Sequence, residues 1–495
     1  MSTRRTRLIA ALSILVAVLP AGPAAADSWT RVGSGGLGDP ARGKSIDLAI
    51  HGGFVWVSST DELPGRFRPR LFRRPLVGDE PWTDATPPWG DAVDGHARDL
   101  FSFAGDLYVA TSFGQVWRHR GASWSNATPP WAGTLPVHAL VAWELVPGTA
   151  TLCAARGSLE LHCGVETGTT TTLPRAPLRD TRPVGQASLI GFRDRLVLAV
   201  GGGSEGSRTC EAWLFGGRWT AMSLDCFGDA GRTWAGQMAI LGEHVYVGTG
   251  GHRPNGVFEL SHGGTYRDVT PALHAFEQIH RYKGAGVAAG RLFVSAHVAF
   301  PPPGFADVVS TPDGDAWTHS NLPGFGPGFT NSTVEAMDAR GPGLYAATVN
   351  LENGFEVWRR NFLVAEMIDE NSPAYRDLIV ELRRQALCLR HRIRGCPSRL
   401  VIVERFALLK EGVDTARHPD DDTKLILVTR QRFAGAGKEL AAALELADQA
   451  DKIALFDPAK AKPIYLKAAQ HLESAMKTTR AAWEAVVAAL RPGKG

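Results

Sequence analysis

The sequence predicts an all-β seven-bladed β-propeller followed by an all-α C-terminal helical bundle. Three observations support this prediction: a β-rich segment recurs before residue 360, turn-forming and aromatic residues are frequent, and the composition changes near residue 361. The chain has 495 residues, with 55 glycines, 31 prolines and 14 tryptophans. Because 44% of the residues are hydrophobic and 21% are charged, the chain can bury a core, and wholesale disorder is excluded.

The first 26 residues have the pattern of a secretory signal peptide. Three arginines precede the apolar run Leu8–Leu19, and three alanines end at Ala26, as small residues do at a cleavage site. The apolar run is shorter than the roughly 20 residues that a membrane-spanning helix needs. We therefore expect cleavage after Ala26 and a secreted or periplasmic protein, with the propeller in residues 27–360 and the bundle in 361–495.

The charge of the chain argues against nucleic acid as a partner. The formal net charge is +3, and removal of the three arginines in the first 26 residues brings it to 3 − 3 = 0. A neutral protein lacks the basic surface that phosphate binding requires. No later segment is apolar enough to span a bilayer, so we expect no transmembrane span in the mature protein.

The β-rich repeat sets the predicted number of blades. Its equivalent positions are separated by 44 to 52 residues, a period typical of propeller blades with several strands each. The last repeat lacks an outer strand of its own, and Ser28–Gly33 resembles the outer strands of the others. We expect this N-terminal strand to complete the last blade and close the ring, which removes exposed sheet edges. The equivalent positions are Trp56, Tyr108, Leu152, Val197, Tyr246, Phe293 and Tyr345.

The region after residue 360 has a different composition, which indicates a domain boundary. It holds 9 of the 11 lysines but only 6 of the 55 glycines and 1 of the 14 tryptophans. Prolines that suit a first helical turn precede amphipathic stretches. The short connections between these stretches predict an antiparallel bundle. The four predicted helices lie near 373–394, 397–416, 419–454 and 458–491.

The six cysteines are expected to form disulfides, because an exported protein matures in an oxidising compartment. Their spacing favours local pairing over the other connectivities. Zinc is the alternative, but no Cys-x-x-Cys occurs in the sequence. The three expected pairs are Cys153 with Cys163, Cys210 with Cys226, and Cys388 with Cys396.

One turn suggests a family. The segment Ser310–Thr318 has the sequence STPDGDAWT and resembles the Asp-box, or BNR, turn of sialidase-like propellers, in a degenerate form with Asp313 one position closer to Trp317. The resemblance covers the propeller and implies that this turn joins the third and fourth strands of a blade. Since an Asp box is structural, the resemblance implies a fold and no catalytic residue.

The mouth of the propeller is the predicted binding site, because the innermost strands begin there and surround the axis. Mixed charge in such a place suits a polar ligand. Loops between the second and third strands open on the same face, and Asp61 lies on one of them. The candidate residues are Asp47, Arg98, His138, Gln186, Gln237, Lys283, Glu335, His252, Arg253, Asn255, His297, Asn350 and Asn353.

These features favour an exported, non-enzymatic binding protein whose mouth takes a glycan, a small polar ligand or a protein partner. The alternative is a glycan-active hydrolase or lyase, which would need two carboxylates at one site; Asp47 and Glu335 are the candidates. We expect no cofactor and no metal. His274 and His280 flank Glu277, but this spacing does not match a zinc motif and is interpreted as a polar loop.

Overall fold

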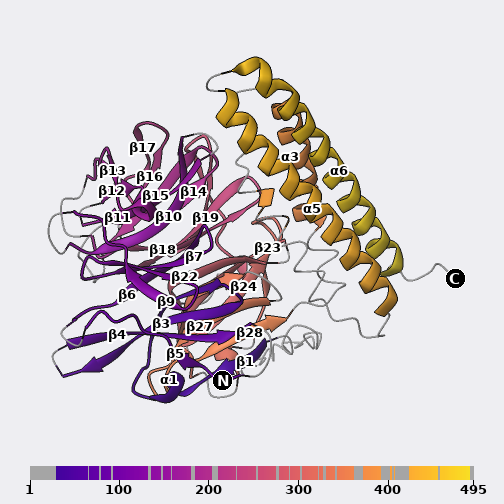
Figure 1. Ribbon diagram of the computed structural model, residues 1–495. Helices are drawn as coiled ribbons and strands as arrows, with labels where there is room; N and C mark the ends of the chain where they lie inside the picture. The colour runs from indigo at the N-terminus through magenta and orange to yellow at the C-terminus, as the bar shows by residue number, and fades with distance from the viewer. Residues whose placement is uncertain are drawn as a thin grey trace, which may run out of the picture.

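The computed structural model shows a propeller of antiparallel sheets and a separate group of long helices beside it (Figure 1). It describes residues 29–361, 372–391, 402–403, 406, 423–454 and 457–490, and the predicted signal peptide therefore lies outside the described residues. Within 29–361 the description omits 65, 77–79, 91–92, 132–134, 147–148, 158, 180–183, 203–209, 230, 252–254, 275–277, 289, 301–303, 322, 327–329 and 340–342.

Five sheets have four strands each, and every neighbouring pair of strands in them is antiparallel. The first is β2 (Ser45–His51), β3 (Phe54–Leu63), β4 (Arg66–Pro75) and β5 (Thr83–Asp84). The second is β6 (Ala97–Phe103), β7 (Asp106–Thr111), β8 (Val116–Arg120) and β9 (Ser123–Asn126). The third is β10 (Val137–Val146), β11 (Thr149–Arg156), β12 (Glu160–Cys163) and β13 (Thr171–Leu173). The fourth is β14 (Gln186–Phe192), β15 (Arg195–Gly201), β16 (Glu211–Phe215) and β17 (Trp219–Ser223).

The fifth of these sheets closes the ring with the N-terminal strand, as the sequence indicates. It has the order β1 (Trp29–Gly33), β28 (Val357–Asn361), β27 (Gly343–Val349) and β26 (Thr333–Ala339). Trp29 lies opposite Arg360 in the register of β1 and β28. The indole N–H of Trp29 also donates to the carbonyl of Ser320 at 2.6 Å, so this strand is tied to the neighbouring sheet as well.

The prediction of seven separate blades is wrong. Beyond the five four-stranded sheets, the remaining strands form one continuous eight-stranded sheet, in which β19 and β22 pair at Gly250 and Arg281. Its strands are β18 (Arg232–Leu241), β19 (His244–Gly251), β20 (Val257–Ser261), β21 (Tyr266–Asp268), β22 (Gln278–Ala288), β23 (Arg291–Phe300), β24 (Phe305–Thr311) and β25 (Thr318–His319).

Glycines explain why these strands join into one sheet. A Cβ atom added at Gly250 would lie 2.6 Å from the Cβ of Arg281, and one added at Gly248 would lie 2.6 Å from the Cβ of Tyr282. Because glycine has no side chain, the two strands approach closely enough to pair. The repeat period in the sequence predicts how often strands recur, but it does not predict the close approach of β19 to β22.

The repeat seen in the sequence is a packing repeat. The equivalent positions lie in the second strand of each repeat and are all at most 2% exposed. Their side chains belong to hydrophobic clusters that fill the spaces between successive sheets. Alternating inward residues on twisted sheets produce such interfaces. The short elements between strands are α1 (Gly35–Gly38) and the 3₁₀ turns η2 (Val165–Thr167), η3 (Ala272–His274) and η4 (Pro323–Phe325).

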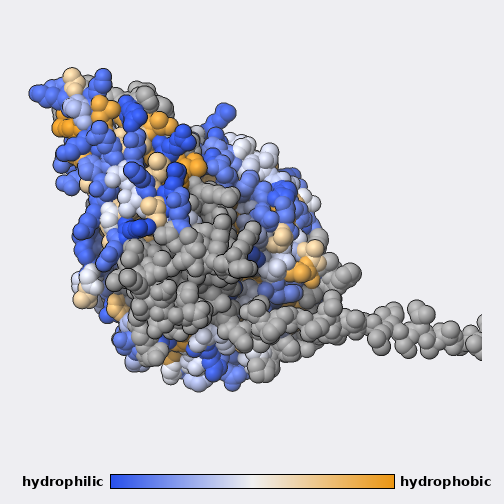
Figure 2. Space-filling view, turned by 90° about the vertical axis from the view of Figure 1, so that its right-hand side faces the viewer, coloured by the Kyte–Doolittle hydropathy of each residue, from blue (hydrophilic) through white to orange (hydrophobic). Residues whose placement is uncertain are grey.

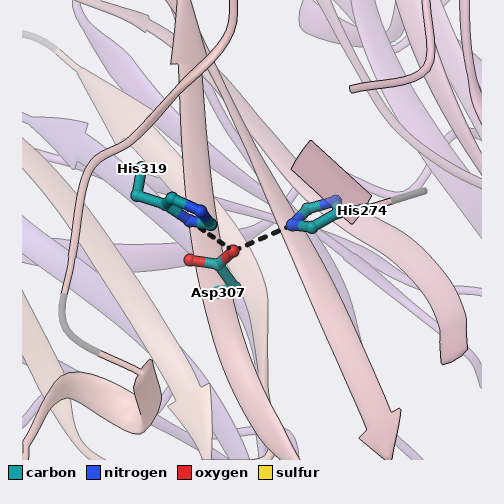
Figure 3. A group of neighbouring side chains, drawn as sticks. All are labelled: His274, Asp307 and His319. Carbon is teal, nitrogen blue, oxygen red and sulfur yellow. Dashed lines mark hydrogen bonds and ion pairs between the residues drawn. The ribbon is translucent and has the colours of Figure 1, made fainter. Parts of the chain in front are cut away.

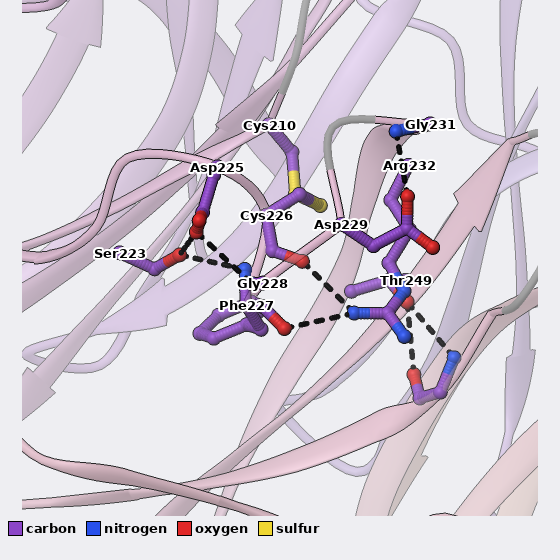
Figure 4. Close-up of a disulfide and its surroundings, with 11 residues drawn as sticks. Cys210, Ser223, Asp225, Cys226, Phe227, Gly228, Asp229, Gly231, Arg232 and Thr249 are labelled. Carbon is purple, nitrogen blue, oxygen red and sulfur yellow. Dashed lines mark hydrogen bonds between the residues drawn. A yellow bond between two sulfur atoms is a disulfide. The ribbon is translucent and has the colours of Figure 1, made fainter.

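Two of the three predicted disulfides are confirmed. Cys153 and Cys163 face each other across β11 and β12, with Cα atoms 3.9 Å apart. Cys210 and Cys226 flank β16 and β17, with Cα atoms 4.7 Å apart. Figure 4 shows that Arg232 braces the second bridge by donating to the carbonyls of Cys226 and Phe227, both at 3.0 Å. Such bridges are typical of proteins that mature in oxidising compartments. The third pair, Cys388 with Cys396, lies outside the described side chains.

The turn Thr311–Trp317 is closed by Asp313, whose carboxylate accepts the backbone N–H of Asp315 at 2.9 Å and of Ala316 at 3.0 Å. Trp317 donates its indole N–H to the carbonyl of Gly314 at 3.1 Å. This is the turn that resembles an Asp box, and the family resemblance itself stays a prediction.

The C-terminal region is helical. Its long elements are α3 (Ser372–His391), α5 (Thr423–Ala454) and α6 (Pro458–Leu490), and they lie side by side in Figure 1. α6 begins as predicted, with proline in its first turn and Asp457 accepting the N–H of Lys460 at 3.1 Å. The only described residues of the predicted helix 397–416 are Ile402, Val403 and Phe406, and all of them are helical.

The helices share a core of their own, built from leucines, alanines and aromatic residues at helical spacing. Among the described residues, none of the helices is both long and apolar enough to cross a membrane. The described surface in Figure 2 is mostly hydrophilic, with hydrophobic residues in small separate patches. The domain boundary near residue 361 stays a prediction, because residues 362–371 lie outside the description.

Candidate functional site

Seven of the residues predicted for the mouth lie on the innermost strands: Asp47, Arg98, His138, Gln186, Gln237, Lys283 and Glu335. We describe these strands as two sides, because the polar side chains of one side mostly bond backbone groups, whereas several on the other side bond one another. On one side are β2, β6 and β10, and on the other are β14, β18, β22 and β26. Contacts between these inner strands run in sequence order around the ring.

The second side carries a cluster that we call the mouth group: Trp234, Arg281, Lys283, His297 and Glu335. Lys283 contacts one carboxylate oxygen of Glu335, and Arg281 donates to the other at 3.3 Å. The Lys283 ammonium also lies 5.7 Å from the ring centroid of Trp234. His297 lies directly opposite Arg281 in the pairing of β22 with β23. The structure therefore brings together three predicted residues, Lys283, Glu335 and His297.

Burial lowers the pKa of the basic residues in the mouth group. Burial lowers the pKa of Lys283 well below its usual value, and the charges of Arg281 and Lys44 lower it further. Burial, Arg281 and His280 lower the pKa of His297 to about 4, so this imidazole is neutral at pH 7. The carboxylate of Glu335 thus faces the guanidinium of Arg281 and the buried amine of Lys283, and the Nε of Arg281 has no hydrogen-bond partner among the described residues. The arrangement favours an anionic ligand group.

On the first side, Arg98 and His138 form a pair. Arg98 donates to Nδ1 of His138 at 3.1 Å and to the carbonyl of Gly185 at 3.0 Å. The Nε2 of His138 donates to the carbonyl of Gly157 at 3.0 Å. Burial and the charge of Arg98 lower the pKa of His138 to about 4, which agrees with a neutral ring that accepts from Arg98. These polar groups hold neighbouring strands together.

Asp47 has a partner that the sequence analysis did not name. Asp47 and Asp99 form a hydrogen-bonded carboxyl pair, and burial raises the pKa of both, that of Asp99 to about 6. Asp47 accepts the backbone N–H of Leu100 at 2.7 Å, and Asp99 accepts that of Leu140. Each carboxyl group therefore ties its own strand to the next inner strand.

This carboxyl pair does not resemble a glycosidase site. The two catalytic carboxyl groups of such enzymes are about 5–5.5 Å apart when they retain configuration, and about 6.5–9.5 Å apart when they invert it. A directly hydrogen-bonded pair leaves no space for a sugar or water between the groups. Glu335, the other predicted carboxylate, is occupied by Arg281 and Lys283. The geometry of these residues therefore does not favour the hydrolase alternative.

Three other predicted residues connect neighbouring segments, Gln186 through a side chain and Gln237 and Asn255 through backbone groups. Gln186 accepts the indole N–H of Trp234. Gln237 accepts from the N–H of Ala285 at 3.1 Å and donates to the carbonyl of Met337 at 3.2 Å. Asn255 donates to the carbonyl of Ile279 at 2.8 Å and to that of His280 at 2.7 Å. These contacts connect adjacent inner strands and their loops.

The remaining predicted residues are not part of the mouth group. Asn350 accepts from the N–H of Asn353 at 3.0 Å within a turn. Asp61 accepts from Arg42 and from Arg70; burial alone would raise its pKa, but these two arginines hold the pKa of Asp61 below its usual value. His252 and Arg253 lie outside the described residues.

Sequence reasoning missed Trp234, Arg281 and Asp99. Arg281 is two residues before Lys283 on one strand, and this spacing could have placed both on one face. Asp99 could not be found in this way, because the register of β6 shifts between Ala97 and Asp99. Similar shifts occur near the beginnings of β2, β10 and β26. A bulge changes which side chains point inward, and sequence alternation does not reveal it.

The interpretation of His274 as part of a polar loop with His280 and Glu277 is also wrong. His274 is buried, and its Nε2 contacts the carboxylate of Asp307 at 2.8 Å. The same carboxylate oxygen contacts Nδ1 of His319 at 2.9 Å. Glu277 lies outside the described residues.

Comparison with known proteins places the chain in no family. No family model matches it, and no curated protein matches it. Similar solved structures include YCF48 bound to D1 peptide, with a TM-score of 0.45, 11% identity, 68% of this chain covered and 97% of that chain. The computationally designed Ika8 protein has a TM-score of 0.39, 11% identity and coverage of 64% and 96%. The β-propeller domain of the Trilobed protease from Pyrococcus furiosus has a TM-score of 0.39, 10% identity and coverage of 64% and 94%.

Proposed function

We propose that the protein is an exported, non-enzymatic binding protein whose mouth group takes a small polar ligand with a carboxylate. The single observation that carries this proposal is the sharing of Glu335 by Arg281 and Lys283. Two basic side chains share one carboxylate, and the Nε of Arg281 has no hydrogen-bond partner among the described residues. A ligand carboxylate would accept from the N–H groups of Arg281 that Glu335 leaves unused.

The shape and chemistry of the group support this ligand class. The Arg281 side chain is 30% exposed, so its guanidinium is within reach of a ligand from solvent. Arginine binds carboxylates through its planar fork of N–H donors. Trp234 is buried beside these groups, with the Lys283 amine over its ring. Acidic sugars carry a carboxylate that Arg281 can bind, so we propose an acidic glycan unit as the preferred ligand.

A comparison of matched sugars tests the proposal. Binding of glucuronate and of glucose to the purified protein would be measured by calorimetry, followed by an array of acidic and neutral glycans. We expect saturable binding of the acidic members only. Hydrogen bonds to charged groups contribute about 1.5–3 kcal/mol, so Arg281→Met and Lys283→Met should each weaken binding by roughly 10-fold or more.

The control for these variants is Arg267→Met. Arg267 also pairs with two carboxylates, of Glu259 at 2.8 Å and of Asp315 at 2.5 Å, but it lies on the outer strand β21. This variant should bind as the wild type does. Equal binding of neutral and acidic sugars, or wild-type affinity in both mouth variants, would contradict the proposal. Binding of a peptide carboxylate in place of any glycan would keep the anion site and overturn the glycan assignment.

A further inference from the structure

A second cluster of polar side chains lies away from the mouth group, where η3 meets the strands β24 and β25. Figure 3 shows His274, Asp307 and His319 converging, with both imidazoles directed at one carboxylate. The three possible ligand atoms all lie within 4.8 Å of one another. They come from three separate elements, so the fold and not a local sequence motif assembles them.

The burial of the cluster is uneven. The side chains of His274 and Asp307 are 1% and 3% exposed, whereas that of His319 is 51% exposed. Two groups are therefore fixed within the protein and the third faces solvent. A bound ion could enter from the side of His319 and keep water in a remaining coordination position.

Asp307 has a polar atom that the protein leaves unused. Its Oδ2 contacts both histidines, but its Oδ1 is buried and has no hydrogen-bond partner among the described residues. A buried carboxylate oxygen without a partner is costly. The carboxyl group could therefore turn toward a cation, or bind it with both oxygens, without breaking another hydrogen bond.

Contacts around the cluster suit metal binding as well. The other ring nitrogen of His274, Nδ1, lies 2.9 Å from the hydroxyl of Tyr282. A second hydrogen bond of this kind orients a ligating imidazole and fixes which nitrogen faces the metal. Tetrahedral zinc with bonds of about 2.0–2.1 Å places its ligand atoms roughly 3.3 Å apart. The observed nitrogen–oxygen separations of 2.8 and 2.9 Å are about half an ångström shorter than this, and the two imidazole nitrogens lie within 4.8 Å of each other.

We propose that His274, Asp307 and His319 form a binding site for a divalent transition metal, with zinc as the favoured ion. Imidazole nitrogens suit zinc and its neighbours, whereas magnesium and calcium prefer sites made of oxygen ligands. Three protein ligands leave at least one coordination position open. This inference is independent of the anion site at the mouth, and it assigns no reaction to the metal.

Metal binding can be measured directly. The purified full chain would be stripped with a chelator and titrated with zinc by calorimetry, with metal content then determined by elemental analysis. We expect one zinc ion per chain at this site and no saturable binding of magnesium. Cobalt(II) substitution should give the visible absorption of a low-coordinate site. His319→Ala changes an exposed side chain and should fold normally, and it should weaken zinc binding at least 10-fold. Asp307→Asn should do the same.

His262→Ala is the matched control. His262 contacts Asp194 at 2.7 Å, and the described residues around that pair place no third ligand beside it. This variant should bind zinc as the wild type does. Wild-type zinc affinity in both His319→Ala and Asp307→Asn would overturn the proposal, as would the absence of saturable zinc binding in the wild type. In either case the hydrogen bonds of Asp307 with the two histidines would have only a structural role.

Discussion

The two sides of the propeller mouth connect their inner strands by different means. From β26 to β10, carboxylates accept backbone N–H groups of the next strand: Asp338 accepts from Ile50, Asp47 from Leu100, and Asp99 from Leu140. From β14 to β26, Gln237 also bonds backbone groups, but the other polar side chains contact one another in series, from Gln186 through Trp234 and Lys283 to Glu335.

The difference teaches which polar residues are available for binding. A carboxylate that accepts from a buried backbone N–H has a structural role, because removing the carboxylate leaves that N–H without a partner. Side chains that satisfy one another can exchange a partner for a ligand at much lower cost. Residues of the same chemical type at equivalent positions of the repeat can therefore have different roles.

The largest effect is expected when a carboxylate of the first side is removed. Asp99→Ala leaves the N–H of Leu140 without its acceptor and removes the hydrogen-bond partner of Asp47. The free energy of unfolding should fall by about 2–3 kcal/mol, measured by chemical denaturation. Asp194→Ala, which removes an exposed carboxylate, should change it by less than about 0.5 kcal/mol. An unchanged stability in Asp99→Ala would show that the carboxyl pair is not a structural tie.

The second expected effect comes from the other side. Glu335→Gln leaves Arg281 and Lys283 facing a neutral amide and should lower the free energy of unfolding by about 1–2 kcal/mol, less than for a deeply buried pair because Arg281 is partly exposed. Acetate, compared with chloride at equal ionic strength, should restore part of this loss by binding to the folded state. Asp99→Ala should show no such rescue. Equal rescue of both variants would mean that the two sides do not differ.

The third prediction concerns pH. The raised pKa of Asp99, about 6, lies above the value of about 3.9 in an unfolded chain, so the folded state holds a proton that the unfolded state releases. This contribution to stability is fully present below about pH 4 and is lost as the pH rises through 6. Asp99→Asn keeps an oxygen that can accept from Leu140 and from the carboxyl group of Asp47, but position 99 then no longer titrates.

The stability of Asp99→Asn relative to the wild type should therefore increase between pH 4 and pH 7, by up to about 2 kcal/mol. Denaturation curves at several pH values measure this difference. A difference that stays constant with pH, or that changes in the opposite direction, would disprove the raised pKa of the pair.

Much of the fold could be predicted from the sequence, because recurring apolar residues such as Trp56 and Tyr345 report burial directly. The closing strand could be predicted because the last repeat lacked one. The merged sheet could not, since it depends on the approach of Gly250 to Arg281. The candidate mouth site was predicted in part, because Lys283, Glu335 and His297 lie close together. Asp99 was not predicted, because a bulge shifts the register of β6. The cluster of His274 and His319 was not predicted either, because the two residues are too far apart in the sequence to form a motif.

The smallest effect tests whether the side chains of the second side act in series. Trp234→Phe keeps an aromatic ring near Lys283 but loses the N–H that donates to Gln186. We expect a loss of stability of about 1 kcal/mol and little change in anion binding, because the hydrogen bond and the cation–π contact use different parts of the indole.

A double-mutant cycle with Gln186→Ala isolates the pair, since each single variant removes the same hydrogen bond. The two changes should then be less than additive, with a coupling of about 1 kcal/mol. If the stability losses of the two single variants add fully in the double variant, the hydrogen bond between Gln186 and Trp234 contributes nothing to stability. The series of side-chain contacts would then start at Trp234 and not at Gln186.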